Sequence, residues 1–159
     1  MKILRYLVML LGGTITGLVL ASALVKVNAP RVTSEEQFAP IVSDWYRVMR
    51  RHGIESLHNV YISAVEEAPV ALQGTVAWCD MSTHQVFVTM PNYRRAEALQ
   101  HKMTIWHELG HCAFDLDHVL GVPHIMNPSI AMEEDYVKYH VVLEAEYLTT
   151  VKVRLAFPH

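Results

Sequence analysis

Residues 106–114 read Trp-His-Glu-Leu-Gly-His-Cys-Ala-Phe, and they lie inside a longer segment whose apolar residues recur every three or four positions. That spacing predicts an amphipathic helix that starts near Arg94 and ends near Phe114. The apolar side chains cover a wide arc, and a helix of that kind packs against more than one neighbour. We therefore expect it to be the central, buried helix of the domain. Its main apolar positions are Leu99, Met103, Ile105, Trp106, Leu109, Cys112 and Ala113.

The flanking segments complete an α+β pattern. Ser34 is the expected N-cap of a first helix, because Gln37 follows three residues later as in a capping box. Alternating apolar residues predict strands, and proline and glycine residues predict the loops between elements. The expected elements are a helix at 34–53, strands at 57–65, 73–79 and 84–90 with a hairpin-sized turn at 80–83, a loop at 115–129 and a helix at 131–151.

The length and the charge of the chain limit its possible functions. At 159 residues it has room for one ordinary domain. Its net charge is -3 with histidine counted neutral, and its Lys and Arg residues form no dense stripe. Proteins that bind nucleic acid present a basic surface, so we expect no nucleic-acid partner.

The first 29 residues are typical of a targeting segment. Two basic residues precede a largely apolar run over 6–25, which is long enough to cross a bilayer as a helix. A small-x-small pattern at 21–23 resembles a signal-peptidase site. We expect residues 1–29 to be a signal peptide or a single-pass membrane anchor with a linker. Residues 30–159 are then a domain outside the cytoplasm, secreted or periplasmic if the segment is cleaved.

His107, Glu108 and His111 form the pattern His-Glu-x-x-His on the expected central helix. Two histidines four residues apart project from the same face of a helix, so their ring nitrogens can bind one Zn²⁺. The carboxylate of Glu108 then lies beside the metal rather than on it. In that position it can act as the general base that takes a proton from the attacking water and passes it to the leaving amine. The sequence therefore predicts one catalytic Zn²⁺.

The residues that follow His111 resemble the long zinc-binding motif of the metzincin clan of metallopeptidases. That motif turns sharply at a glycine and supplies a third ligand from the next loop. In this chain Phe114 stands at the glycine position, and Asp117 stands where the pattern has its third ligand. If the turn comes one residue later, Asp115 takes the left-handed conformation, which Asp tolerates better than Phe does, and His118 becomes the ligand.

Short exported and phage-type metallopeptidases that contain His-Glu-Leu-Gly-His-Cys, with a histidine seven residues on, are similar to this second version. The resemblance implies that His107, His111 and His118 are the zinc ligands. Asp117 is the main alternative for the third ligand, and His124 or a distal glutamate stays open.

Met126 lies in the sequence His-Ile-Met-Asn-Pro at 124–128, which is similar to the methionine turn that metzincins place beneath the zinc site. A thioether offers a polarizable and compliant floor for the imidazole rings. The resemblance implies a compact α+β domain with a small mixed sheet, a central zinc-binding helix and a C-terminal helix. It also implies that the strand over 84–89 lines the cleft and pairs with an extended substrate.

Cys79 and Cys112 are the only cysteines in the chain. Cys112 directly follows the second zinc histidine, and Cys79 ends an expected strand that packs near the same helix. In an exported protein these two residues are candidates for a disulfide between the sheet and the zinc helix. Two separate buried thiols are the alternative.

These features predict a zinc metallopeptidase, an endopeptidase that cleaves peptide or protein substrates, with the membrane as a further partner if residues 1–29 are uncleaved. Two alternatives stay open: a zinc hydrolase of cell-wall peptide cross-links, and a non-catalytic, zinc-stabilised module that binds a partner at the cell envelope. The carboxylate of Glu108 favours catalysis, because structural zinc sites are usually closed by four protein ligands.

Overall fold

The structure is a computed structural model that describes residues 31–96, 98–128 and 133–158, without the side chains of 133–139. The expected targeting segment at 1–29 lies outside these residues. Among the helices that are described, none combines the length and the apolar character needed to span a membrane.

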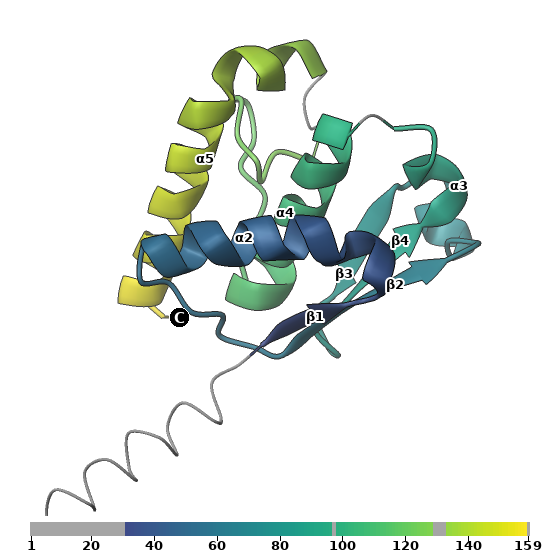
Figure 1. Ribbon diagram of the computed structural model, residues 1–159, viewed down its shortest axis with the longest axis horizontal. Helices are drawn as coiled ribbons and strands as arrows, with labels where there is room; N and C mark the ends of the chain where they lie inside the picture. The colour runs from purple at the N-terminus through teal and green to yellow at the C-terminus, as the bar shows by residue number, and fades with distance from the viewer. Residues whose placement is uncertain (1–30, 97, 129–132, 159) are drawn as a thin grey trace, which may run out of the picture.

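The protein has an α+β fold with a small mixed sheet, as the sequence predicts. Four strands pair in the order β1-β2-β4-β3 (Figure 1). The β1–β2 and β2–β4 pairs are parallel, and the β3–β4 pair is the expected antiparallel hairpin. The strands are β1 (Val32–Ser34), β2 (Val60–Val65), β3 (Ala77–Asp80) and β4 (Gln85–Thr89).

The helices pack on one face of this sheet (Figure 1). Inward-facing residues of β2 and β4, among them Ile62 and Val86, are fully buried, whereas the alternate residue Tyr61 is 45% exposed. This is the alternation expected of a sheet with one covered face. The helices are η1 (Glu36–Phe38), α2 (Ala39–Arg51), η2 (Val70–Leu72), α3 (Met90–Tyr93), α4 (Ala98–Phe114) and α5 (Glu133–Ala156).

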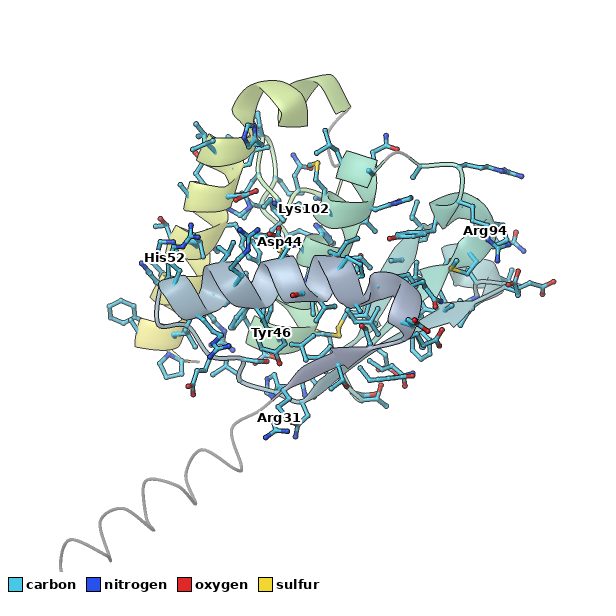
Figure 2. All side chains as sticks on the ribbon, in the orientation of Figure 1. Arg31, Asp44, Tyr46, His52, Arg94 and Lys102 are labelled. Carbon is cyan, nitrogen blue, oxygen red and sulfur yellow. A yellow bond between two sulfur atoms is a disulfide. The ribbon has the colours of Figure 1, made fainter. Side chains whose placement is uncertain are left out.

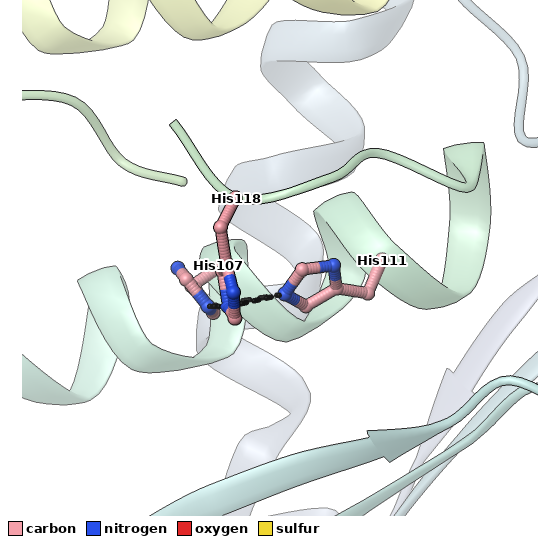
Figure 3. Close-up of side chains that lie close together, drawn as sticks. All are labelled: His107, His111 and His118. Atoms are coloured by element: carbon pink, nitrogen blue, oxygen red, sulfur yellow. Dashed lines mark hydrogen bonds between the residues drawn. The ribbon is translucent and has the colours of Figure 1, made fainter. Parts of the chain in front are cut away.

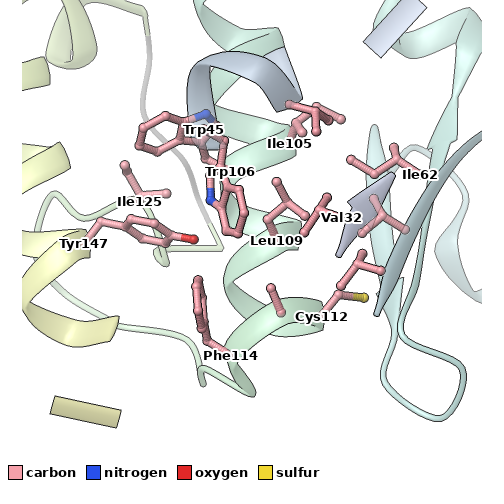
Figure 4. Packing of buried hydrophobic residues seen from close by; sticks show 14 of the residues in the cluster. Val32, Trp45, Ile62, Ile105, Trp106, Leu109, Cys112, Phe114, Ile125 and Tyr147 are labelled. Carbon is pink, nitrogen blue, oxygen red and sulfur yellow. The ribbon is translucent and has the colours of Figure 1, made fainter. Parts of the chain in front are cut away.

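Helix α4 is the centre of the core, and its predicted burial is confirmed. Figure 4 shows Trp106, Leu109 and Cys112 along α4, with Tyr147 of α5 on one side and Ile62 of the sheet on the other. Lys102 in the first half of the helix makes ion pairs with Asp44 of α2, at 3.1 Å, and with Glu144 of α5, at 2.6 Å (Figure 2). Apolar packing and these ion pairs together hold α4 in a defined position.

The predicted capping box at Ser34 is wrong. Ser34 ends the short strand β1, and the α-helix begins at Ala39 with a proline in its first turn. The main-chain N–H of Glu35 donates to the Ile62 carbonyl at 3.0 Å, and the Glu35 carboxylate accepts from the Ala64 N–H at 3.2 Å. Pairing with β2 therefore keeps Ser34 and Glu35 extended, so the helix cannot begin at Ser34.

The expectation that strand 84–89 lines the cleft is also wrong. β4 lies between β2 and β3, so its backbone groups are used on both sides. β3 is at the edge of the described sheet and packs directly against α4. The predicted disulfide is present: Cys79 of β3 is bonded to Cys112 of α4, with their Cα atoms 5.7 Å apart. β3 is therefore the strand that faces the candidate site.

Candidate metal centre

Three histidine side chains converge, two from α4 and one from the loop that follows it (Figure 3). The Nε2 atoms of His107 and His111 are 3.2 Å apart. The Nε2 atom of His118 is 3.3 Å from that of His107 and 3.1 Å from that of His111. Three nitrogens that each lie about 2.0–2.1 Å from one tetrahedral centre are separated by about 3.3 Å, so this triangle has the size that Zn²⁺ requires.

Main-chain carbonyls determine which ring nitrogens carry the protons. His107 donates from Nδ1 to the Ile125 carbonyl at 2.7 Å, and His111 donates from Nδ1 to the Leu116 carbonyl at 2.5 Å. In a neutral imidazole the other nitrogen, Nε2, then has only a lone pair. Two lone pairs thus face each other across 3.2 Å, an arrangement that a cation between them stabilises. Hydrogen bonds of this kind orient metal-binding histidines.

Burial keeps these imidazoles neutral. The pKa of His107 is lowered to about 4, mainly by desolvation and to a smaller extent by the neighbouring histidines. Burial also lowers the pKa of His111. Neutral imidazole is the form that binds a metal ion, so both side chains are ready to bind at neutral pH. A set of three imidazole nitrogens suits zinc and the later first-row transition metals better than Mg²⁺ or Ca²⁺.

The end of α4 explains how His118 reaches this group. Asp115 has a φ of 53°, in the left-handed region, as the sequence predicts if the turn comes after Phe114. Its N–H donates to the His111 carbonyl at 2.9 Å, which is the pattern of an αL helix end. The chain then needs only two further residues before His118. Asp117, the alternative ligand, is exposed and is not part of the histidine cluster.

His124, the other histidine considered as a ligand, has a different role. Its Nδ1 accepts from the Met126 N–H at 2.9 Å, and its Nε2 lies 3.1 Å from the hydroxyl of Thr150 in α5. These contacts hold the turn that carries Met126 against the C-terminal helix. His124 therefore supports the floor of the site rather than the metal position.

Met126 is fully buried against α4, where Gly110 allows a close approach. A Cβ atom at position 110 would lie 2.3 Å from the Met126 Sδ atom and 3.3 Å from the ring of Tyr147. Only glycine leaves space for the thioether at this point between His107 and His111. The structure thus gives a packing reason for the glycine inside the His-Glu-x-x-His pattern.

We expect Gly110→Ala to destabilise the protein by about 1–3 kcal/mol, because the added methyl group overpacks a filled core. Higher helix propensity offsets up to about 1 kcal/mol of this cost. The free energy of unfolding in urea measures the effect. Equal stability of Gly110→Ala and wild type would contradict this packing account.

Glu108 lies next to the histidines but does not belong to the cluster. Its side chain is buried, at 8% exposed, and it lines the same cavity as the three histidines. Burial raises the pKa of Glu108 from 4.5 to about 8, and a hydrogen bond from the Cys79 N–H partly opposes this shift. The carboxyl group therefore occupies a dry position from which it can exchange a proton near neutral pH.

The raised pKa of Glu108 makes the metal-free protein sensitive to alkaline pH. A carboxyl group whose pKa is higher in the folded state contributes stability below pH 4.5, and this contribution is lost as the pH rises through 8. Relative to Glu108→Gln, metal-free wild type should therefore lose on the order of 4 kcal/mol of unfolding free energy between pH 4.5 and pH 9. Urea unfolding of both proteins in chelator measures the difference, and a difference that is constant with pH would contradict the shift.

A second histidine cluster, which the sequence analysis did not identify, caps the end of α4. The rings of His58 and His84 stack with centroids 3.7 Å apart, and His58 donates to the Asp115 carboxylate at 2.9 Å. The Arg154 guanidinium lies 3.4 Å from the same carboxylate. Parallel rings do not aim their lone pairs at a common point, and the Arg154 cation opposes a bound metal ion.

All four carbonyls of the last turn of α4 have partners in this region. The donors are Asp115 N–H to His111 at 2.9 Å, His84 Nδ1 to Cys112 at 3.1 Å, Leu57 N–H to Ala113 at 2.9 Å and Arg154 Nε to Phe114 at 3.3 Å. These carbonyls have no partner within the helix itself, and cationic groups are favourable at this end. Three of the four donors, His84, Leu57 and Arg154, come from distant segments, so no sequence spacing indicates them.

Comparison of the chain with protein-family models, with curated proteins and with solved structures finds no significant match. The functional argument therefore rests on the geometry of the site.

Proposed function

We propose that the chain is a zinc-dependent, metzincin-like metallopeptidase that hydrolyses peptide bonds. The observation that carries this proposal is the convergence of three histidine Nε2 atoms beside the buried carboxylate of Glu108 in one open cavity. Three protein ligands among the described residues leave a fourth position for water, which is typical of catalytic zinc sites. A structural zinc site would be closed by a fourth protein ligand, so this geometry favours a catalytic role over a zinc-stabilised binding module.

The size and the lining of the cavity suit a peptide substrate. It has a volume of about 310 Å³ and lies between β3 and α4, and a second cavity of about 330 Å³ adjoins it along the same strand. Residues on both walls line the first cavity: Thr75, Ala77, Trp78 and Cys79 on the strand side, and His107, Glu108, His111, His118 and Pro128 on the other. The strand residues of this lining belong to or precede β3, so the cavity lies at the edge of the described sheet.

The main-chain N–H and C=O groups of successive β3 residues point alternately toward β4 and toward the edge of the sheet. The Val76 carbonyl accepts from the Thr89 N–H at 2.8 Å, so Val76 faces β4 and Ala77 faces the edge. Cys79 lies two residues further along the strand and therefore faces the same way as Ala77. The outward backbone groups of Ala77 are thus available to an extended peptide, which would bind by strand addition next to the histidines.

Each residue of the site has a defined role in this proposal. His107, His111 and His118 would hold Zn²⁺, and the Ile125 and Leu116 carbonyls orient two of these ligands. Bound there, Zn²⁺ supplies Lewis acidity, which polarises the scissile carbonyl and lowers the pKa of water to about 7. Glu108 accepts the proton of the attacking water and passes it to the leaving amine.

We further propose that the chain acts outside the cytoplasm. The disulfide between Cys79 and Cys112 supports this location, because disulfides persist in oxidising compartments. The basic and apolar N-terminal residues agree with export, as a cleaved signal or as an anchor.

The experiment that tests the proposed function uses the full-length chain purified in mild detergent. Zinc content and cleavage of a mixed peptide library are measured on the same sample, before and after removal of metal by a chelator and after zinc is added back. We expect about one zinc per chain and cleavage that disappears and returns with the metal. A chain that binds zinc and cleaves no peptide would instead favour the zinc-stabilised binding module, or the cell-wall hydrolase if it cleaves peptide cross-links of isolated cell walls.

A further inference from the structure

The disulfide between Cys79 and Cys112 joins the substrate-binding edge of the sheet to the helix that carries the general base. We propose that this bond positions Glu108 and β3 for catalysis, so that the oxidised protein is active and the reduced protein is not. Cys79 and Cys112 are positioning residues in this account, because they act through Glu108 and the strand. The inference rests on the proposed peptidase function and adds a form of regulation to the same site.

The disulfide connects Cys79 to the face of α4 that carries Glu108. Glu108 and Cys112 are four residues apart, so their side chains project from the same face of the helix, one turn apart. The Cys79 sulfur is bonded to that of Cys112, and Cys79 and Glu108 line the same cavity. The covalent bond therefore holds β3 beside the carboxylate that must accept the proton.

The backbone of β3 is hydrogen-bonded to the sheet on one side only, and on the other side the strand packs against α4, to which the disulfide joins it. The strand has four residues, lies at the edge of the described sheet and pairs with β4 alone. Short edge segments of this kind open locally at a low cost in free energy. Without the bond to Cys112, we expect β3 to move away from α4, which changes the surroundings of Glu108 and displaces the outward backbone groups of Ala77. A displacement of about 1 Å at a catalytic group costs about 100-fold in rate.

The bond is accessible from the cleft. Cys112 is fully buried, whereas Cys79 is only half-buried and lines the cavity of the site. Its sulfur lies 3.5 Å from the sulfur of the exposed Met81. A small thiol can therefore reach Cys79 without unfolding of the core around Cys112.

The reduction consumes two thiols. A thiolate attacks the Cys79 sulfur, which forms a mixed disulfide and releases the Cys112 thiolate. A second thiol attacks the mixed disulfide, which releases the Cys79 thiolate and a small-molecule disulfide. Both cysteines end as thiols. The two electrons that reduce their disulfide come from the two small-molecule thiols, which are oxidised to a disulfide. A chain made in a reducing compartment is thus held inactive, and an oxidising compartment activates it.

The test compares kcat and KM of the zinc-loaded full-length chain before and after reduction with a phosphine, and again after reoxidation. The double variant Cys79→Ala/Cys112→Ala is the matched control, because it lacks the disulfide but leaves every other side chain of β3 and α4 unchanged. We expect kcat to fall by about 10- to 100-fold on reduction and to return on reoxidation, while zinc affinity changes by less than about 3-fold. The double variant should show the lower kcat and no response to the phosphine.

Hydrogen exchange gives a readout that does not depend on activity. Amides of Ala77–Asp80 should exchange at least about 10-fold faster in the reduced chain, while those of the buried part of α4 do not change. Equal kcat in oxidised and reduced chains overturns the inference and leaves the peptidase function intact. Loss of zinc and of folded structure on reduction also overturns it, because the bond then has a purely structural role. An oxidised chain that cleaves nothing overturns the peptidase function itself, and the inference with it.

Discussion

Replacing Glu108 with glutamine should leave zinc bound and lower kcat/KM for peptide cleavage by about 10²- to 10⁴-fold, the usual contribution of a general base. Glutamine has the shape of glutamate but cannot accept the proton of the attacking water. The variant should also keep its fold, because Glu108 is buried with a raised pKa and the neutral side chain suits the same dry position. Zinc content, kcat and KM are measured on one preparation.

The exposed residue Glu55 provides the matched control for this substitution. Glu55→Gln makes the same substitution at an exposed side chain outside the histidine cluster and should not change cleavage. If Glu108→Gln cleaved peptides at the wild-type rate, another group would have to be the base. Loss of zinc from Glu108→Gln would contradict the placement of this carboxylate beside the metal rather than on it.

Replacing His118 with alanine should weaken zinc binding by at least about 100-fold. Loss of a residue that only supports a metal ligand already costs about 10- to 100-fold, and His118 contributes a ligand atom. Its Nε2 atom is 3.3 Å and 3.1 Å from those of His107 and His111, and no other described residue joins this cluster. Competition with a chromophoric chelator measures the dissociation constant.

The neighbouring residue Asp117 is the matched control, because it is exposed and outside the cluster. Asp117→Ala should change the dissociation constant by only a few-fold, through the loss of a negative charge that acts on His111. A loss of affinity in Asp117→Ala as large as that in His118→Ala would mean that the loop after α4 rearranges when zinc binds. Wild-type affinity in His118→Ala would remove the third ligand from the proposal.

Much of the candidate site could be predicted from local sequence. The four-residue spacing of His107 and His111 gives their common face on any helix, and the wide apolar arc predicts that this helix is buried. The left-handed turn at Asp115 follows from the steric limits on Phe114, and it brings His118 to the other two histidines. The zinc, the peptidase activity and the role of the first 29 residues stay predictions.

Other features were decided only by the tertiary structure. The spacing of Ser34 and Gln37 fits a helix cap, but pairing with β2 draws Ser34 into a strand, because hydrogen bonds to a distant segment outweigh a local preference. Apolar alternation is the same in an edge strand and an inner strand, so it cannot show that β3 rather than β4 lies at the site.

The clearest contrast is between the two ends of the site. His107 and His111 lie one turn apart, and the geometry of an α-helix relates them without any other part of the chain. The cap of α4 combines His84, Leu57 and Arg154, which belong to three separate segments and meet only because the sheet and α5 pack on the same helix. Local sequence thus determined what the helix presents to a metal, and tertiary packing determined what holds the helix in place and which strand faces the metal site.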